Sequence, residues 1–351
     1  MLKDKVQENG EFHKADLINA QSRIEYFDIA KGMGILSIIL GHMGVEGVDR
    51  IVFTFHVPLF FLISGYFISR KITFVDYAKK RIRALLVPYA FTSVLLIIAE
   101  IPIGILKGQY SEIGKKMRAT FVAALYGSGA NVNKTILGIS PIGAIWFLLA
   151  LLWAILLVKS IINKKYGKWI ILVVAVSSYL TSFYIWLPWD IQAGGTAALF
   201  VYVGCVLREK NFEVEKENWK LFICGIVILF LEVICNIRVS VVSNYFKYTI
   251  VSIIGAMMIS YSVLYISRWL EMTKWIKKVL KFYGENSIII LCFHLVELNN
   301  VPWRRIIEYF NRSAIQGYWG YLLVFLGKIF FVTISTYIAL RISWLRKIFV
   351  K

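Results

Sequence analysis

Residues 51–69 read IVFTFHVPLFFLISGYFIS, an apolar run of nineteen residues that contains no Lys, Arg, Asp or Glu. An α-helix needs roughly 20 predominantly apolar residues to cross the hydrocarbon core of a bilayer. This run therefore predicts a transmembrane helix. Comparable runs recur along the chain and predict about ten spans, near residues 29–45, 51–69, 84–106, 142–162, 168–187, 193–208, 219–237, 247–267, 286–301 and 319–340.

The composition of the whole chain supports this interpretation. Of its 351 residues, 58% are hydrophobic and 17% are charged, whereas a soluble domain has about 45–50% apolar and about 25% charged residues. These values exclude a disordered chain, a secreted disulfide scaffold and an ordinary soluble α/β enzyme. They predict an all-α, polytopic membrane protein.

The cysteines lie in or beside apolar segments and lack the spacing of metal ligands. Buried free thiols are therefore favoured over disulfides, and no metal site is expected. The four positions are Cys205, Cys224, Cys235 and Cys292.

The basic residues predict the orientation of the chain. The formal net charge is +19, but Lys and Arg form short clusters between apolar runs rather than one basic domain of the kind that binds nucleic acid. With the N-terminus inside, the inner segments hold 27 Lys and Arg and the outer segments hold 11. Because cytoplasmic loops are enriched in Lys and Arg, we expect both termini in the cytoplasm.

The chain is predicted to form one membrane domain, residues 24–351, after a cytoplasmic tail of residues 1–23. One outer segment, residues 107–141, is long and carries five basic residues. A loop of this length is usually functional or partly structured. Two interpretations remain open for it, a re-entrant element that lines a cavity and a mobile outer loop.

Ionisable side chains inside spans are costly and are candidate functional residues by default. The first span holds Asp28, Lys31 and His42. Lys31 and His42 are eleven residues apart, which places them within roughly 20° on one helix face and roughly 16 Å apart along the axis. Asp28 is one helical turn from Lys31 and can pair with it. The alternative is that Lys31 anchors the helix at the interface and His42 bonds to a neighbouring helix.

Two later spans carry further polar groups. His56 lies near the outer end of the second span, at a depth similar to that of His42, so the two imidazoles could share a cavity. Ser64 in the same span suits close helix packing. His294 and Glu297 are three residues apart, on one face, where a carboxylate can orient an imidazole; a polar contact between helices is the alternative.

A basic cluster, KKRIR at residues 79–83, precedes the third span. It suits several phosphates, because Arg offers a bidentate fork and Lys a point charge, although membrane anchoring also explains it. The chain has no GxxxxGK[ST], GxGxxG, HExxH or GxSxG motif in the required context. ATP hydrolysis, nucleotide-dependent redox chemistry and zinc hydrolysis are therefore unsupported.

Taken in order, these motifs resemble the membrane acyltransferase-3 family. The most specific is a basic residue followed, after ten others, by a histidine, here Lys31 and His42. The remaining matches are FHVPLFFLISGY at residues 55–66, the basic cluster before Pro88 and Tyr89, IWFLLAL at residues 145–151 with Trp146, and GENS at residues 284–287 with Asn286, followed by His294. The branch that is most similar contains sugar O-acetylases of capsule or exopolysaccharide pathways.

The resemblance implies a ten-helix enzyme of the bacterial cytoplasmic membrane. It would take an acetyl group from cytoplasmic acetyl-CoA, with no metal involved, and transfer it to a hydroxyl of a cell-surface or lipid-linked sugar or polysaccharide.

 The implied partners are therefore acyl-CoA, a sugar acceptor and the lipid bilayer, with no nucleic acid.

The resemblance also implies roles for the candidate residues. Lys31, Lys80, Arg81 and Arg83 would hold the phosphates of the donor. His42 would be the general base or a transient acyl carrier, and His56 and His294 would orient the acceptor or stabilise the oxyanion. The residues expected to orient or support the site are Asp28, Ser64, Trp146, Asn286 and Glu297.

Two positions depart from the family pattern. Lys31 stands where Arg is common, which keeps the charge but loses the fork. The usual Arg-x-x-Arg pair is best matched by Lys80 and Arg83, with Arg81 as the competing assignment. The phosphate ligands therefore remain open at this point.

Two other classes of function compete with the enzyme. A secondary transporter or a flippase of glycan precursors would also use intramembrane His and Lys residues, and a non-catalytic partner of a glycan-assembly complex is the third hypothesis. Transporter folds often contain two related halves, and the sequence has no such half-to-half similarity.

Overall fold

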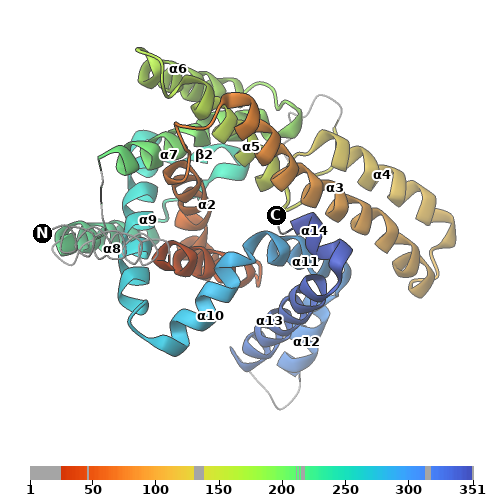
Figure 1. The fold of residues 1–351 in the computed structure, drawn as a ribbon. Coiled ribbons are helices and arrows are strands. Elements are labelled where there is room, and N and C mark those ends of the chain that lie inside the picture. Colours follow the sequence, from red (N-terminus) through yellow and green to blue (C-terminus); the bar gives the residue numbers. More distant parts are fainter. Residues whose placement is uncertain are drawn as a thin grey trace, which may run out of the picture.

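The computed structural model describes residues 25–45, 47–129, 138–210, 212, 214, 218–312 and 318–349. The predicted tail, residues 1–23, lies outside the described residues, as do residues 130–137 of the long outer segment. A first helix covers residues 25–41. The helices that follow are α2 (Val48–Tyr66), α3 (Phe74–Leu106), α4 (Ile113–Tyr126), α5 (Trp146–Ile161), α6 (Gly167–Thr181), α7 (Ile191–Glu209), α8 (Trp219–Ile234), α9 (Ile250–Leu270), α10 (Lys274–Glu285), α11 (Ser287–Asn300), α12 (Trp303–Arg312), α13 (Tyr318–Arg341) and α14 (Ser343–Phe349) (Figure 1).

The fold is helical apart from a short hairpin. Its strands, β1 (Val239–Ser240) and β2 (Tyr245–Phe246), pair antiparallel between α8 and α9. Three short 3-10 turns complete the described elements, η1 (Tyr110–Glu112), η2 (Pro188–Asp190) and η4 (Val241–Ser243).

Each predicted span overlaps one helix of the structure. Five helical segments are long and apolar enough to cross a membrane, Val48–Tyr66, Phe74–Leu106, Pro188–Glu209, Ile250–Leu270 and Trp319–Arg341. The pair α10 and α11, bent by 72°, raises this number to six if it counts as one span, and α5 and α6 are shorter apolar helices. The protein is therefore a helical membrane protein, while the count of ten spans and the cytoplasmic termini stay predictions.

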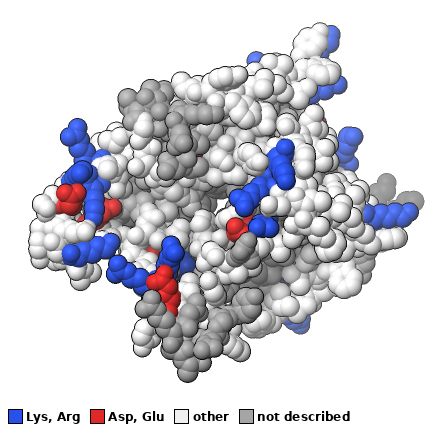
Figure 2. All heavy atoms as spheres, turned by 180° about the vertical axis from the view of Figure 1, so that it is seen from behind, with Lys and Arg blue, Asp and Glu red and all other residues white. Residues whose placement is uncertain are grey.

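The surface agrees with a membrane location. Large apolar side chains are exposed on several helices, among them Val173, Phe230 and Phe330. Most of the face drawn in Figure 2 is uncharged, and Lys and Arg gather in a few groups. Contiguous apolar surface of this kind is covered by lipid or protein rather than water.

The cysteines are all free, but the expectation that all are buried is wrong. Cys205 and Cys292 are buried, whereas Cys224 and Cys235 are exposed. The two exposed thiols belong to α8 and its C-terminal end, and most residues of α8 are not covered by other helices. An apolar run does not reveal whether a side chain faces protein or lipid, because both surroundings are apolar.

Helix α7 is the centre of the helix packing and contacts α2, α5 and α6. Its contact with α2 is close, because a Cβ atom on Gly204 would clash with the backbone oxygen of Leu62. On the facing helix, a Cβ atom on Gly65 would clash with the backbone of Val201. Small residues allow helix backbones to approach in this way inside a membrane. The contact fixes α2, and with it His56 and Ser64.

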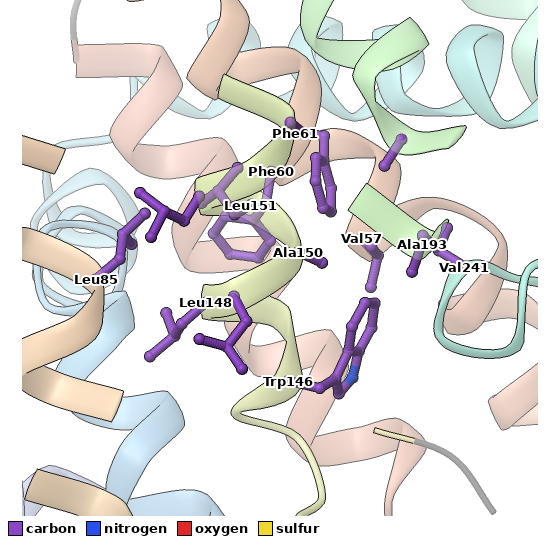
Figure 3. Close-up of a cluster of buried hydrophobic side chains, with 14 of the residues drawn as sticks. Val57, Phe60, Phe61, Leu85, Trp146, Leu148, Ala150, Leu151, Ala193 and Val241 are labelled. Atoms are coloured by element: carbon purple, nitrogen blue, oxygen red, sulfur yellow. The ribbon is translucent and has the colours of Figure 1, made fainter. Parts of the chain in front are cut away.

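Helix α5 is apolar on all sides over residues 146–158 and runs through the core. Figure 3 shows its side chains Trp146, Leu148 and Leu151 beside Phe60 and Phe61 of α2. A helix that is hydrophobic all round is buried in the core of a large protein or a membrane domain. Because α5 is held by α2, α3 and α7, Trp146 at its first residue has a fixed position next to the site described below.

The described part of the long outer segment is structured. Helix α4 packs against α3, and the Tyr89 hydroxyl of α3 donates to the backbone oxygen of Ala124 at 2.6 Å. The helix ends at Tyr126, and the next residue, Gly127, has a φ of 75°, which is left-handed and suits glycine. The following residues bring Gly129 against the ring of Trp146. The segment thus contributes to the wall of a cavity.

Candidate active site

One cavity, here called the basic cavity, holds several of the predicted site residues. Its volume is about 650 Å³, and its walls include Asp28, Lys31, Ser64, Arg81 and Asn286. The Lys31 ammonium lies 2.5 Å from the Asp28 carboxylate, as the spacing of three residues predicts. The walls hold two cations, Lys31 and Arg81, together with the carboxylates of Asp28 and Glu285, and the guanidinium of Arg81 can donate to an anionic ligand that enters the recess.

The first helix is held in place by α10. A Cβ atom on Gly32 would clash with the backbone of Leu280, and one on Gly284 would clash with the backbone of Asp28, so the two helices touch backbone to backbone. At the end of the first helix, Glu25 bonds to Lys281 at 2.8 Å and to Lys277 at 3.0 Å. The hydrogen bond from Lys281 and, to a smaller extent, the one from Lys277 hold the pKa of the Glu25 carboxyl below its usual value.

Arg81 takes its position from a group of buried side chains at the start of α3. Its guanidinium lies over the ring of Tyr77, 5.1 Å from the centroid, and the Lys159 ammonium lies 5.6 Å from the same ring. Lys159 is buried and donates to the backbone oxygens of Ser69 at 2.6 Å and Ile72 at 2.7 Å. The loop before α3 is therefore tied to α5, and this tie sets the direction of Arg81.

The other two predicted phosphate ligands of the cluster lie elsewhere. Lys80 and Arg83 are exposed and do not line the basic cavity. At about 100° per residue, Arg81 points about 100° away from Lys80 and about 200° away from Arg83 on the helix, so the three side chains do not share one face. Of the two assignments left open by the sequence, the one with Arg81 places a cation in the wall of the basic cavity.

A second recess, the histidine cavity, has a volume of about 290 Å³ and contains both His42 and His56 in its walls. Trp146, Phe53 and Phe60 also line it. The ring of Phe53 lies between the two imidazoles, with ring centroids 5.8 Å from His42 and 5.3 Å from His56. The imidazoles therefore face one cavity, as predicted, but are separated by an aromatic ring.

Hydrogen bonds to the backbone define the tautomers of these imidazoles. Nδ1 of His42 lies 2.8 Å from the backbone oxygen of Ile38, and Nδ1 of His56 lies 2.6 Å from that of Val52. A carbonyl oxygen only accepts, so each Nδ1 carries the hydrogen and donates it. In a neutral ring the lone pair then resides on Nε2, which is the atom available to a substrate.

The basic cavity and the histidine cavity are neighbours. Four residues belong to the walls of both, and these are Ile38, Phe60, Phe147 and Leu291. The rings of Phe60 and Phe147 meet edge to face, with centroids 5.7 Å apart. We refer to these four side chains as the throat. A ligand that extends from Lys31 to His42 has to pass it.

His42 also contacts a buried polar network, which is formed by His294, Glu297, Trp303 and Lys328. Nε2 of His294 lies 3.4 Å from Nδ1 of His42, and Nδ1 of His294 lies 2.6 Å from Oε1 of Glu297. The Lys328 ammonium bonds to both Glu297 oxygens, at 3.1 Å each, and the indole nitrogen of Trp303 donates to Oε2. His294 and Glu297 are fully buried, and Lys328 is 1% exposed.

A third recess, the Trp303 cavity, lies on the same side of His42 as this network. Its volume is about 630 Å³, and it is lined by His42, Trp303, Arg304, Tyr321 and Lys328, among others. His42 thus belongs to the walls of two cavities, and it is adjacent through the throat to a third. A side chain in this position can contact groups that arrive from different directions.

Lys328 and Trp303 were not among the residues chosen from the sequence. Lys328 did carry a signal, because it is a lysine in the middle of the predicted span 319–340, and intramembrane charges are candidate functional residues. Trp303 had none, since aromatic residues are common near the ends of spans. Within the part of the chain that the structure describes, no group of three or more His, Cys, Asp or Glu could hold a metal ion.

One comparison with known proteins identifies the family of this chain. A family model described as an acyltransferase domain matches residues 24–341, and the chain therefore belongs to the acyltransferase-3 family. No curated protein and no solved structure matches the chain. The protein is thus a membrane acyltransferase.

Proposed function

We propose that this protein is an O-acyltransferase that moves an acetyl group from cytoplasmic acetyl-CoA to a hydroxyl of a cell-surface or lipid-linked sugar. The observation that carries the proposal is the position of His42. Its ring lines the histidine cavity and the Trp303 cavity, and the basic cavity adjoins the first of these through the throat. A base in this position can meet a donor and an acceptor that enter separately.

The basic cavity is the proposed donor site. Lys31 and Arg81 would bind the phosphates of acetyl-CoA, with Lys80 and Arg83 adding positive charge at the exposed approach. The pantetheine arm would pass the throat and bring the thioester to His42, over the roughly 16 Å of helix that separates Lys31 from His42. Ser64 and Asn286 offer hydrogen bonds along this path, and Asp28 holds Lys31.

The proposed chemistry is a direct transfer. Nε2 of His42 takes the proton of the acceptor hydroxyl while the oxygen attacks the thioester carbonyl carbon. When the tetrahedral intermediate collapses, the carbon–sulfur bond breaks and His42 returns the proton to the leaving thiolate. The products are an acetyl ester and the CoA thiol, and no proton is gained or lost overall. Transfer through an acetylated His42 is the alternative left open by the sequence.

The hydrogen bonds support different roles for the three histidines. His294 directs its Nε2 lone pair at Nδ1 of His42, which suits a residue that orients the base. Nε2 of a neutral His56 is an acceptor, because Nδ1 is the donor to Val52. His56 would therefore bind the acceptor hydroxyl rather than stabilise an oxyanion.

The acetyl-CoA donor and the sugar acceptor are tested with the purified protein in lipid nanodiscs. Radiolabelled acetyl-CoA is supplied with membrane glycolipids, and both thiol release and label transfer are followed. The His42→Ala variant should lose activity by roughly a hundredfold or more, as expected for loss of a general base, while inserting normally into membranes. A transporter or scaffold would leave acetyl-CoA intact, and near-normal activity of His42→Ala would refute the assigned base.

A further inference from the structure

Lys328 is a buried charge that the proposed transfer does not yet use. It lies in α13 and is 1% exposed. Burying an ammonium group in a membrane domain is expensive unless a partner compensates it. Lys328 is connected to the proposed base, His42, through Glu297 and His294.

The contacts of Lys328 all lead to one carboxylate. Its Nζ lies 3.1 Å from both oxygens of Glu297, and it lies over the ring of Trp303, 4.9 Å from the centroid. Trp303 donates to the same carboxylate through its indole nitrogen. Together with Nδ1 of His294, three donors therefore converge on Glu297. A group that accepts from three donors is held as a carboxylate.

The charges of this network balance only when His294 is neutral. The positive charge of Lys328 compensates the negative charge of Glu297, so a proton added to His294 would leave an unpaired positive charge in a buried place. Neutral His294 donates from Nδ1 to Glu297, and its Nε2 is left as an acceptor. That atom faces Nδ1 of His42.

We infer that Lys328 is a positioning residue that keeps His294 neutral, so that Nε2 of His294 is a second acceptor, beside the Ile38 carbonyl, for the Nδ1 hydrogen of His42, and Nε2 of His42 stays free as the base. This inference rests on the proposed function. Without the charge of Lys328, Glu297 would attract a proton to His294. Both nitrogens of an imidazolium are donors, so His294 would then repel the Nδ1 hydrogen of His42 and oppose proton uptake by His42.

The first experiment removes the charge and keeps most of the length of the side chain. Lys328→Met should lower kcat for acetyl-CoA-dependent thiol release by about tenfold or more, with the KM for acetyl-CoA within about twofold of the parent. Lys328→Arg, which keeps the charge, should retain more activity than Lys328→Met. The control is Thr336→Val in the same helix, because the Thr336 hydroxyl is buried without a hydrogen-bond partner among the described residues; it should behave like the parent.

A pH profile separates this role from a merely structural one. In Lys328→Met, alkaline pH removes the extra proton from His294, so the deficit in kcat relative to the parent should shrink as the pH rises from neutral. The other titratable or charged groups around His294 and Lys328 are His42 and Glu297. Arg304, Glu308 and Tyr321 lie in the walls of the adjoining Trp303 cavity. These are unchanged in the variant, and the parent profile accounts for them.

A double variant covers the case in which Lys328→Met does not fold. Glu297→Gln with Lys328→Met removes both charges and restores the balance, so it should accumulate and should exceed the activity of each single variant. The inference is overturned if Lys328→Met keeps kcat within about twofold of the parent, if its deficit is the same at every pH, or if the folded double variant is inactive. Should the parent itself fail to cleave acetyl-CoA, the proposed function fails instead.

Discussion

Nδ1 of His42 lies 3.4 Å from Nε2 of His294, although the two residues are 252 positions apart in the chain. The contact joins the end of the first helix to α11, a helix that also carries Glu297. It turns two separate polar positions into one line of hydrogen bonds from a carboxylate to the proposed base. Such a line holds an imidazole in one orientation and one tautomer.

This contact predicts a graded effect of His294. His294→Ala should lower kcat by about tenfold to a hundredfold, less than loss of the base itself, which costs roughly a hundredfold to ten-thousandfold. The KM for acetyl-CoA should change little, because Lys31 and Arg81 lie in another cavity. Steady-state kinetics of thiol release would measure both constants. A loss as complete as that of His42→Ala would instead assign His294 a direct role in the chemistry.

Donor binding should depend more on Arg81 than on its neighbours. Arg81→Ala removes a charge from the wall of the basic cavity and should raise the KM for acetyl-CoA by about tenfold or more, as for loss of a charge-assisted hydrogen bond. Lys80 and Arg83 are exposed, so each alanine variant should raise it by less than about fivefold. The KM values of the three alanine variants, measured at one salt concentration, rank the three residues by their contribution to donor binding. A larger effect at Lys80 or Arg83 would contradict the assignment.

The close contact of α2 and α7 predicts a sharp effect of one methyl group. Gly204→Ala should lower the free energy of unfolding by about 1–3 kcal/mol, because the new Cβ atom meets the backbone of α2. Thermal unfolding in detergent measures this loss. Gly114→Ala is the matched control in α4, since its Cβ atom would enter open space. Equal melting temperatures for the two variants would show that the helices can separate without cost.

The ion pairs of Glu25 predict a pH-dependent contribution to stability. Its pKa is lowered in the folded state by hydrogen bonds from Lys281 and Lys277, so its carboxylate stabilises the fold above the unfolded-state pKa. This contribution is lost as the pH falls through the lowered pKa. Glu25→Gln should therefore melt below the parent at neutral pH, and the difference should shrink in acid.

A glutamate in an exposed pair is the control for this effect. Glu112 lies 3.7 Å from Lys115, and both side chains are largely exposed, so Glu112→Gln should melt with the parent at each pH. A difference between parent and Glu25→Gln that is constant with pH would contradict the role given to the ion pairs of Glu25.

The class of the protein and the places of most of its helices could be predicted from the sequence. Hydrophobic runs are a local property, and a helix in a membrane satisfies its own backbone hydrogen bonds. Each predicted span therefore overlaps a helix. The pairing of Asp28 with Lys31, and that of His294 with Glu297, were also within reach, because residues three apart share a helix face.

Other features depended on how the helices are rotated and packed. The sequence did not distinguish Arg81 from Lys80 and Arg83, because the choice depends on the Tyr77 and Lys159 contacts that orient the start of α3. It also placed Cys224 and Cys235 inside, although both are exposed. An apolar segment looks the same whether protein or lipid covers it.

By itself, the sequence determined that this chain is a helical membrane protein of the acyltransferase-3 family with His42 as its main candidate residue. This was possible because apolar runs and motifs of fixed spacing are properties of short segments of the chain. Only the tertiary structure brought His294, Glu297 and Lys328 to His42, and only it arranged three cavities around that ring. Contacts between distant segments arise from the packing of whole helices, which no local pattern encodes.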